Sequence, residues 1–324
     1  SDVQKKINFR RPGFSNISTE RKEEDSVEFT SGLVDGLTTG APIAFIIKNN
    51  NHNHKDYSNL KNIFRPSHAD FTYQKKYGIR DVLGGGRSSA RETACRVVAG
   101  EIASQFLKTK AIYIYSFVST VNSLSLEKSY NELDLSKIYD NDMRCPDFDL
   151  AKKMKDFILN TKEEGDSLGG CVSTVVKGVS AGLGEPLYNK LNARLSFSIM
   201  SINAVKGIEF GLGFDSCKLK GSEYNDIFVK KGDKIETNSN NSGGIQGGIS
   251  NGQDVFFKVA FKPTSSIKRK QKTINNKGEE VFFLNSGRHD PCVLPRAVPV
   301  VEAMTALCLM DMYLLNFSSK IDNL

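Results

Sequence analysis

Residues 84–106 carry the sequence GGGRSSARETACRVVAGEIASQF, which combines a sharp turn with the start of a helix. Ser89, followed three residues later by Glu92, fits a capping box, in which each side chain satisfies a backbone N–H at the helix start. Apolar residues then recur at helical spacing, at Ala90, Ala94, Val97, Val98, Ile102 and Phe106. The stretch therefore predicts an amphipathic helix that begins near Ser89 and buries one face.

The rest of the chain alternates between strand-like and helix-like patterns. β-Branched and aromatic residues bounded by glycine or proline predict strands at about 42–48, 111–118, 171–179, 205–210 and 254–262. Further helices are predicted at about 149–163, 187–201 and 299–316, the last opened by Pro299 and apolar on nearly every face. The strands lack the regular alternation with helices of a doubly wound sheet, which favours an α+β fold. No low-complexity linker divides the sequence, so a single domain over residues 1–324 is expected.

The composition excludes several classes of protein. Lysine and arginine number 44 against 37 acidic residues, and the net charge of +7 suits nucleic acid, a membrane surface or a small polyanion alike. The most apolar segment, 297–315, contains Glu302 and Asp311, so no membrane partner is expected. The six cysteines match no zinc spacing and no secreted disulfide scaffold, which predicts no metal and a reducing compartment. A cytoplasmic location is expected, the alternative being the interior of an organelle.

The glycine turn that opens the quoted stretch is a candidate anion site. Three consecutive glycines bring backbone N–H groups together before a helix N-terminus, and two arginines and two serines add donors. The alternative is a capped helix behind a flexible loop with arginines on the surface.

Two other turns combine arginine, histidine and a carboxylate. They are FRPSHAD at 64–70 and GRHDP at 287–291, and both are positions where catalytic residues are often found. The alternatives are a structural or solvated His68 and a capping role for Asp290.

Two segments flank the strand expected at 254–262. The glycines of GGIQGG at 243–248 allow close approach to a flat ligand, and KPTSS at 262–266 supplies phosphate donors, although each alone could be a plain hairpin turn. The basic run at 267–272 lacks the aromatic residues of a nucleic-acid module, which favours a solvated loop and no nucleic-acid partner.

Taken together and in this order, the segments resemble chorismate synthase. They are 65–70, 84–92, 200–207 (MSINAVKG), 243–252, 287–292 and 296–299. The resemblance implies a layered β-α-β sandwich, a homotetramer, and a lyase that converts 5-enolpyruvylshikimate 3-phosphate to chorismate and phosphate in the shikimate pathway. It also implies an anti 1,4-elimination that requires reduced FMN, with NADPH needed only if the enzyme reduces its own flavin.

The same resemblance implies the site residues. Contacts with FMN are expected from Arg87, Ser88, Ser89, Asn203, Ala204, Gly247, Lys262, Pro263, Thr264, Ser265, Ser266 and Arg288. Contacts with the triply anionic substrate are expected from Arg10, Arg65, Arg91 and Arg288, with Arg21 as an additional candidate. His68 matches a histidine that protonates or stabilises the flavin, and Asp290 a carboxylate near flavin N5 that relays the abstracted proton.

The sequence departs from the family pattern at two places. The family's Gly-Glu-Ser-His-Gly segment, whose histidine is thought to protonate the departing phosphate, does not occur here. We expect a missing N-terminal region to carry it, the alternative being a shortened chain. Asn16 stands where many relatives carry a substrate-binding arginine, and an asparagine contributes hydrogen bonds without charge.

Two other functions remain open at this stage. A flavin reductase that uses NADPH would turn over flavin without a shikimate-type substrate. A phosphate- or RNA-binding protein would use the basic surface and show binding that weakens steeply with salt.

Overall fold

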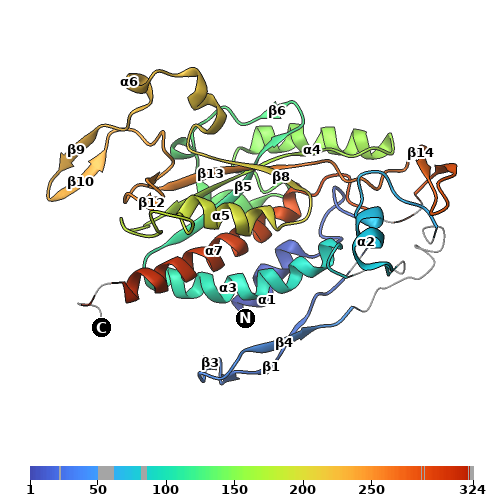
Figure 1. The fold of residues 1–324 in the computed structure, drawn as a ribbon, viewed down its shortest axis with the longest axis horizontal. Helices are drawn as coiled ribbons and strands as arrows, with labels where there is room; N and C mark the ends of the chain where they lie inside the picture. Colours follow the sequence, from blue (N-terminus) through green and yellow to red (C-terminus); the bar gives the residue numbers. More distant parts are fainter. Residues whose placement is uncertain are drawn as a thin grey trace.

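The computed structural model describes residues 1–21, 23–49, 62–81, 86–285, 287, 289–319 and 321. At its centre lies a five-stranded antiparallel sheet in the strand order β6–β5–β7–β13–β8 (Figure 1). The strands are β5 (Tyr113–Val121), β6 (Leu124–Ser125), β7 (Gly170–Lys177), β8 (Val205–Phe210) and β13 (Val255–Phe261). The predictions of strands at about 111–118, 171–179, 205–210 and 254–262 are therefore confirmed.

The sheet turns one apolar face toward a layer of helices. In β13 burial alternates strictly, and Val255, Phe257, Val259 and Phe261 are buried, as the two-residue period of a strand requires. Helices α1 (Asp2–Arg10), α3 (Thr93–Thr109), α5 (Leu191–Met200) and α7 (Leu294–Ser318) form the neighbouring layer (Figure 1).

Helices α3 and α7 approach each other closely because α3 carries a glycine at the contact. A Cβ atom on Gly100 would lie 2.3 Å from the Cα atom of Ala303, which no packed structure tolerates. Helix α7 is long and apolar enough to cross a membrane by length and composition, but 61% of its most apolar window is buried inside the protein. It has the packing of a core helix.

Two helix starts differ from the prediction. Helix α7 begins at Leu294, with Pro295 in its first turn, and not at Pro299, which lies inside the helix. Pro299 removes one backbone hydrogen bond, and the buried surroundings of the helix offset that loss. Helix α5 begins at Leu191 and not near 187, because Tyr188 adopts a left-handed φ of 44° that no helix residue has.

The helix predicted near Ser89 begins with a short 3₁₀ turn. That turn, η2 (Ala90–Glu92), precedes α3, and the Ser89 hydroxyl accepts a hydrogen bond from the backbone N–H of Arg91 at 3.2 Å. The predicted reciprocal contact of Glu92 is not formed, because the Ser89 backbone N–H donates to the Gly86 carbonyl at 3.2 Å, and Glu92 instead pairs with Arg96 at 2.9 Å. Of the two contacts that the capping box predicts, the structure therefore has the one made by the Ser89 side chain and lacks the one made by Glu92.

A second, smaller β layer covers the far side of the helices. Strands β1 (Val27–Ser31) and β4 (Ala44–Ile47) pair in antiparallel fashion and pack Val27, Phe29, Phe45 and Ile47 against the core. The strand expected at about 42–48 is confirmed in β4. Sheet, helices and the β1–β4 pair together make the layered α+β arrangement that was predicted (Figure 1).

The remaining elements lie around this core. They are β2 (Leu33–Val34), β3 (Leu37–Thr38), α2 (Asp70–Tyr77), η3 (Tyr130–Glu132), η4 (Leu135–Asp140), α4 (Phe148–Glu163), η5 (Gly213–Lys218), α6 (Gly221–Tyr224), β9 (Phe228–Lys231), β10 (Lys234–Thr237), β11 (Ile245–Gln246), β12 (Ile249–Ser250), β14 (Gln271–Ile274) and β15 (Glu280–Phe283). Helix α4 confirms the helix predicted at about 149–163. In Figure 1, α2 and β14 lie at the right end of the molecule, and β9, β10 and β12 at the left end.

Candidate active site

Arg10, the last residue of α1, has 2% of its surface exposed and is the most deeply buried of the predicted substrate-binding arginines that the structure describes. Its Nε donates to Thr93 Oγ1 at 3.1 Å, its Nη1 to Asp25 Oδ2 at 3.2 Å, and its Nη2 to the Ala90 carbonyl. Because Ala90 begins η2 and Thr93 begins α3, Arg10 joins the end of α1 to the turn at Ser89 and to the start of α3.

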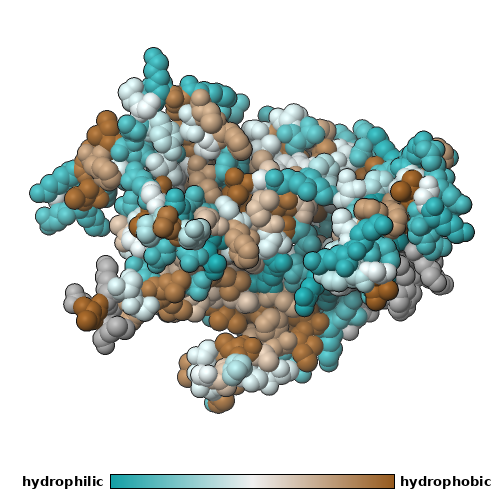
Figure 2. All heavy atoms as spheres, viewed as in Figure 1, coloured by the Kyte–Doolittle hydropathy of each residue, from teal (hydrophilic) through white to brown (hydrophobic). Residues whose placement is uncertain are grey.

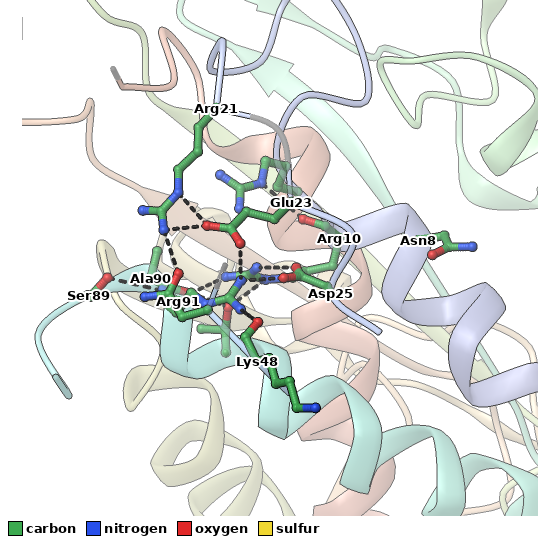
Figure 3. A network of polar contacts seen from close by, with 12 residues as sticks. Asn8, Arg10, Arg21, Glu23, Asp25, Lys48, Ser89, Ala90 and Arg91 are labelled. Carbon is green, nitrogen blue, oxygen red and sulfur yellow. Dashed lines mark hydrogen bonds and ion pairs between the residues drawn. The ribbon is translucent and has the colours of Figure 1, made fainter. Parts of the chain in front are cut away.

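Asp25 lies between two of the predicted arginines, as Figure 3 shows. Its buried carboxylate contacts Arg10 through Oδ2 and Arg91 through Oδ1. Glu23, two residues earlier, forms an ion pair with Arg21 and lies 3.9 Å from Arg91. Arg10, Arg21 and Arg91, which are far apart in the sequence, therefore meet in one network of polar contacts.

The network has a cationic excess. Three arginines face the two carboxylates of Glu23 and Asp25, which leaves one positive charge in this group. Burial lowers the pKa of the Arg10 guanidinium to about 9; the charges of Arg296 and Arg91 act in the same direction, and Asp25 acts against them. A further anion placed beside Arg10 would be stabilised by the same charges.

Asp290 connects this network to the loop that contains Thr264. Its Oδ2 pairs with Arg296 of α7, whose Nε donates to the Arg10 carbonyl at 3.0 Å. Its Oδ1 accepts from the Thr19 backbone N–H at 2.9 Å, and its own carbonyl accepts from Thr264 Oγ1 at 3.0 Å. Both carboxylate oxygens of Asp290 are therefore engaged.

The loop from Lys262 also meets the Asn203–Ala204 turn. The backbone N–H of Lys262 donates to the Ala204 carbonyl at 3.0 Å, and Ala204 has a left-handed φ of 71°, which side-chain-bearing residues adopt at a cost. Within the described part of the chain, the buried Oδ1 of Asn203 has no hydrogen-bond partner. Burial and the charge of Lys206 lower the pKa of Lys262.

These residues could hold a flavin mononucleotide. A buried amide oxygen without a partner can accept from a ring N–H, and an ammonium with adjacent hydroxyls at Thr264, Ser265 and Ser266 suits a phosphate. Pro263 is exposed, and Ser266 lines a surface pocket together with His289 and Asp290.

The glycine turn contributes a second group of donors. Gly86 has a left-handed φ of 67°, and its carbonyl accepts from the Ser89 backbone N–H at 3.2 Å. Ser88 and Ser89 are half-buried, whereas Arg87 is exposed and forms no ion pair with the residues that the structure describes. Gly84 and Gly85 lie outside those residues.

His68 and Arg65 belong to a separate cluster at the start of α2. Both contact Asp70, and Arg80 lies 3.1 Å from the same carboxylate. Burial alone would raise the pKa of Asp70, but hydrogen bonds from Arg65 and His68 and their charges together hold it well below its usual range. Over the described ranges, no hydrogen bond or ion pair joins this cluster to Asp290.

Among the described residues, Gly247 joins neither cluster. It lies in the turn between β11 and β12, before β13, whereas Lys262 directly follows β13. Gly247 accordingly lies near β12, at the end of the molecule opposite α2 (Figure 1). Arg288, predicted to contact both FMN and substrate, lies outside the described residues.

The sequence reasoning missed several partners of the predicted site residues. It assigned no role to Glu23, Asp25 or Thr19, and it used Arg296 only as part of the segment 296–299. Each of the four contacts a predicted site residue. The only signal for Glu23 and Asp25 was the run of three acids at 23–25, shortly after Arg21, and such runs are common on protein surfaces. In the basic run at 267–272, Arg269 pairs with Glu164 and Asp166, and the last two residues begin β14, so only the first part of the run is the predicted loop.

The layered α+β fold brings together a buried arginine network, a hydroxyl-rich loop and a carboxylate. Such a fold and site define a class of proteins suited to binding a small polyanion. A family model described as chorismate synthase matches residues 1–314, so the chain belongs to the chorismate synthase family. This is the family of a shikimate-pathway enzyme.

Individual relatives agree with this assignment. Chorismate synthase of Christiangramia forsetii is 58% identical over 98% of this chain and 89% of its own length. Chorismate synthase of Phocaeicola vulgatus is 53% identical over the same shares. A crystal structure of chorismate synthase superimposes with a TM-score of 0.77 at 28% identity, covering 98% of this chain and 83% of the other.

Proposed function

We propose that this protein converts 5-enolpyruvylshikimate 3-phosphate to chorismate and phosphate by an anti 1,4-elimination, as a carbon–oxygen lyase. The observation that carries the proposal is the match of the chorismate synthase family model over residues 1–314. The buried arginine network supports it, because the substrate bears one phosphate and two carboxylates and so requires several cations.

The chain's arginines would bind the substrate. Arg10 and Arg91 offer a fixed, water-poor site, since both are held by Asp25 and Arg10 is almost fully buried. Arg21 is more exposed and adds charge at the rim. Arg65 and Arg288 remain proposed substrate contacts, although Arg65 already uses Nε and Nη2 on Asp70.

The residues around Lys262 would hold reduced FMN. Asn203 would bind the ring edge through its buried amide oxygen, and Lys262 with Thr264 to Ser266 would bind the phosphate, with Arg87, Ser88 and Ser89 contributing further donors. When bound, reduced FMN supplies electron density that a weakly acidic ring hydrogen requires for its removal. NADPH enters only if the protein reduces its own flavin.

His68 and Asp290 would handle protons. His68 is partly exposed, with 24% of its side chain accessible, so its ring can reach a ligand while Asp70 holds the other side. Asp290 would accept the abstracted proton at one carboxylate oxygen. That step requires one of its present donors, Arg296 or the Thr19 N–H, to yield the oxygen.

We further propose a cytoplasmic homotetramer. Exposed large hydrophobic side chains such as Tyr188, Phe214 and Ile235 support self-association. Figure 2 shows hydrophobic residues gathered at the lower centre of one face, over the helix layer and the β1–β4 pair. The six free cysteines accord with a reducing compartment.

An anaerobic assay tests the reaction. The protein is incubated with chemically reduced FMN and 5-enolpyruvylshikimate 3-phosphate, and phosphate and chorismate are measured. Both products are expected in equal amounts, and only when flavin and substrate are present together. Flavin turnover with NADPH without release of phosphate would instead indicate a flavin reductase.

A further inference from the structure

Asp70 is fixed in its cluster by an arginine that contacts both of its oxygens. Its Oδ2 accepts from the Arg65 backbone N–H at 3.0 Å and from Arg65 Nε at 2.7 Å, while its Oδ1 accepts from Arg65 Nη2 at 2.8 Å. A planar guanidinium that spans both oxygens sets the orientation of a carboxylate. Arg80 adds a further contact to Oδ1 at 3.1 Å. Asp70 is therefore held facing its third neighbour, His68.

The imidazole Nδ1 of His68 has two neighbours with opposite requirements. It lies 2.9 Å from Asp70 Oδ1 and 3.0 Å from Arg65 Nη2. The carboxylate can only accept a proton from Nδ1, since the surrounding cations keep it ionised, and the guanidinium can only donate one. Arg65 Nη2 already donates to Asp70 Oδ1, so it does not need Nδ1 as an acceptor. A proton on Nδ1 therefore adds a charge-assisted hydrogen bond from His68 to Asp70 and leaves Arg65 Nη2 with its own acceptor.

The turn that carries His68 keeps these groups together. The backbone N–H of His68 donates to the Arg65 carbonyl at 3.2 Å, across Pro66 and Ser67. Asp70 begins α2 directly afterwards. The three interacting side chains therefore come from one short, closed segment. Within the described residues, no hydrogen bond engages His68 Nε2.

We propose that Asp70 is a positioning residue that holds the neutral His68 ring as its Nδ1–H tautomer, so that Nε2 exchanges the proton with the bound ligand. The inference deepens the proposed function, on which the catalytic role of His68 rests. In the donating step, the charged ring gives its Nε2 proton to an acceptor atom of the ligand and becomes neutral. Its Nδ1 proton stays on the hydrogen bond to Asp70, whose carboxylate remains charged.

Histidine-selective ¹⁵N labelling tests the tautomer without any assay of activity. The chain has only four histidines, and the His68 signals are assigned by their loss in His68→Gln. At a pH where the ring is neutral, the wild-type spectrum is expected to show the proton on Nδ1 and none on Nε2. A ring protonated on Nε2 would overturn the inference, whatever the behaviour of any variant.

Asp70→Asn tests the part played by the carboxylate. The amide keeps the shape and removes the charge, so Nε2–H is expected to gain population and kcat to fall by about 10- to 100-fold, with a smaller change in KM. Asp215→Asn is the matched control, because it removes the same charge from an exposed side chain paired with Lys218. An unchanged tautomer ratio in folded Asp70→Asn would overturn the inference.

The two proposals can fail separately. In one outcome, the wild-type His68 ring is in the Nδ1–H form and the tautomer ratio shifts in Asp70→Asn, but the protein forms no chorismate. That result would support the inference about the tautomer and overturn the proposed function. If the wild type forms chorismate but its neutral His68 ring carries the proton on Nε2, the result would support the proposed function and overturn the inference about the tautomer.

Discussion

The Nη1 atom of Arg10 lies 3.2 Å from Oδ2 of Asp25, and the two side chains are 2% and 0% exposed. Fifteen residues separate them in the sequence. Oδ1 of the same carboxylate contacts Arg91, so one buried acid pairs with two arginines, one from α1 and one from η2. The geometry of the arginine network depends on this acid.

Asp25→Asn is expected to destabilise the protein by about 3–5 kcal/mol, because it leaves buried guanidinium charge without its partner. Asparagine tolerates the left-handed φ of 49° at this position, so backbone strain does not contribute to the difference. Urea unfolding measures the change, with Asp311→Asn on the exposed surface as control. Equal stability of Asp25→Asn and wild type would contradict the role assigned to the pair.

Gly100→Ala is expected to lower stability by about 1–3 kcal/mol or more, since the added methyl group would meet the backbone of α7 at Ala303. Gly221→Ala is the control, because nothing lies within 4 Å of its Cβ position. Thermal unfolding should show a lower Tm for the first variant and little change for the second. A tolerated Gly100→Ala would mean that α3 and α7 are less tightly packed.

The ion pairs of Asp70 predict a pH dependence of stability. Since the folded-state pKa of Asp70 is depressed below its unfolded value of about 3.9, its contribution is fully present above about pH 4 and is lost as the pH falls further. The stability difference between wild type and Asp70→Asn should therefore shrink in acid. Urea unfolding of both proteins between neutral pH and about pH 3 measures this difference in free energy of unfolding. A difference that grows in acid would refute the depressed pKa of Asp70.

Ser67→Gly is expected to stabilise the protein by up to about 1 kcal/mol. Ser67 follows Pro66 in the turn before His68 and has a φ of 55°, which glycine adopts without strain. Part of the gain is offset by the greater freedom of glycine in the unfolded chain. Ser222→Gly, in the exposed first turn of α6, should instead be neutral or slightly destabilising. The two changes in free energy of unfolding should thus differ in sign.

Asp290→Asn is expected to abolish chorismate formation while substrate and flavin still bind. The amide cannot take up a proton as a carboxylate does, yet it retains an oxygen for Arg296 or the Thr19 N–H. Binding of both ligands by calorimetry, alongside the anaerobic assay, separates the two effects. Product formation at the wild-type rate would exclude Asp290 from proton relay.

Local patterns sufficed for much of the fold. Burial in β13 alternates along Val255–Phe261 as its residues predict, and the strands expected at about 111–118, 171–179 and 205–210 lie beside it in one sheet. Errors occurred where tertiary packing overrides local preference. Pro299 is a typical helix start, yet it lies within α7, because burial among neighbouring helices outweighs one lost hydrogen bond.

The sequence by itself determined the types of residue available: arginines for anions, a hydroxyl-rich loop after a strand, and a histidine near a carboxylate in a proline turn. Their order along the chain also indicated the family. Only the tertiary structure decided that Arg10 and Arg91 share Asp25 and that Asp290 joins Arg296 to the Thr264 loop. It also decided that the β11–β12 hairpin lies at the end of the molecule away from α2 (Figure 1). The physical reason is that ion pairs and hydrogen bonds act over a few ångströms in space, whereas the partners in this site are up to 286 positions apart in the sequence, so no local pattern encodes them.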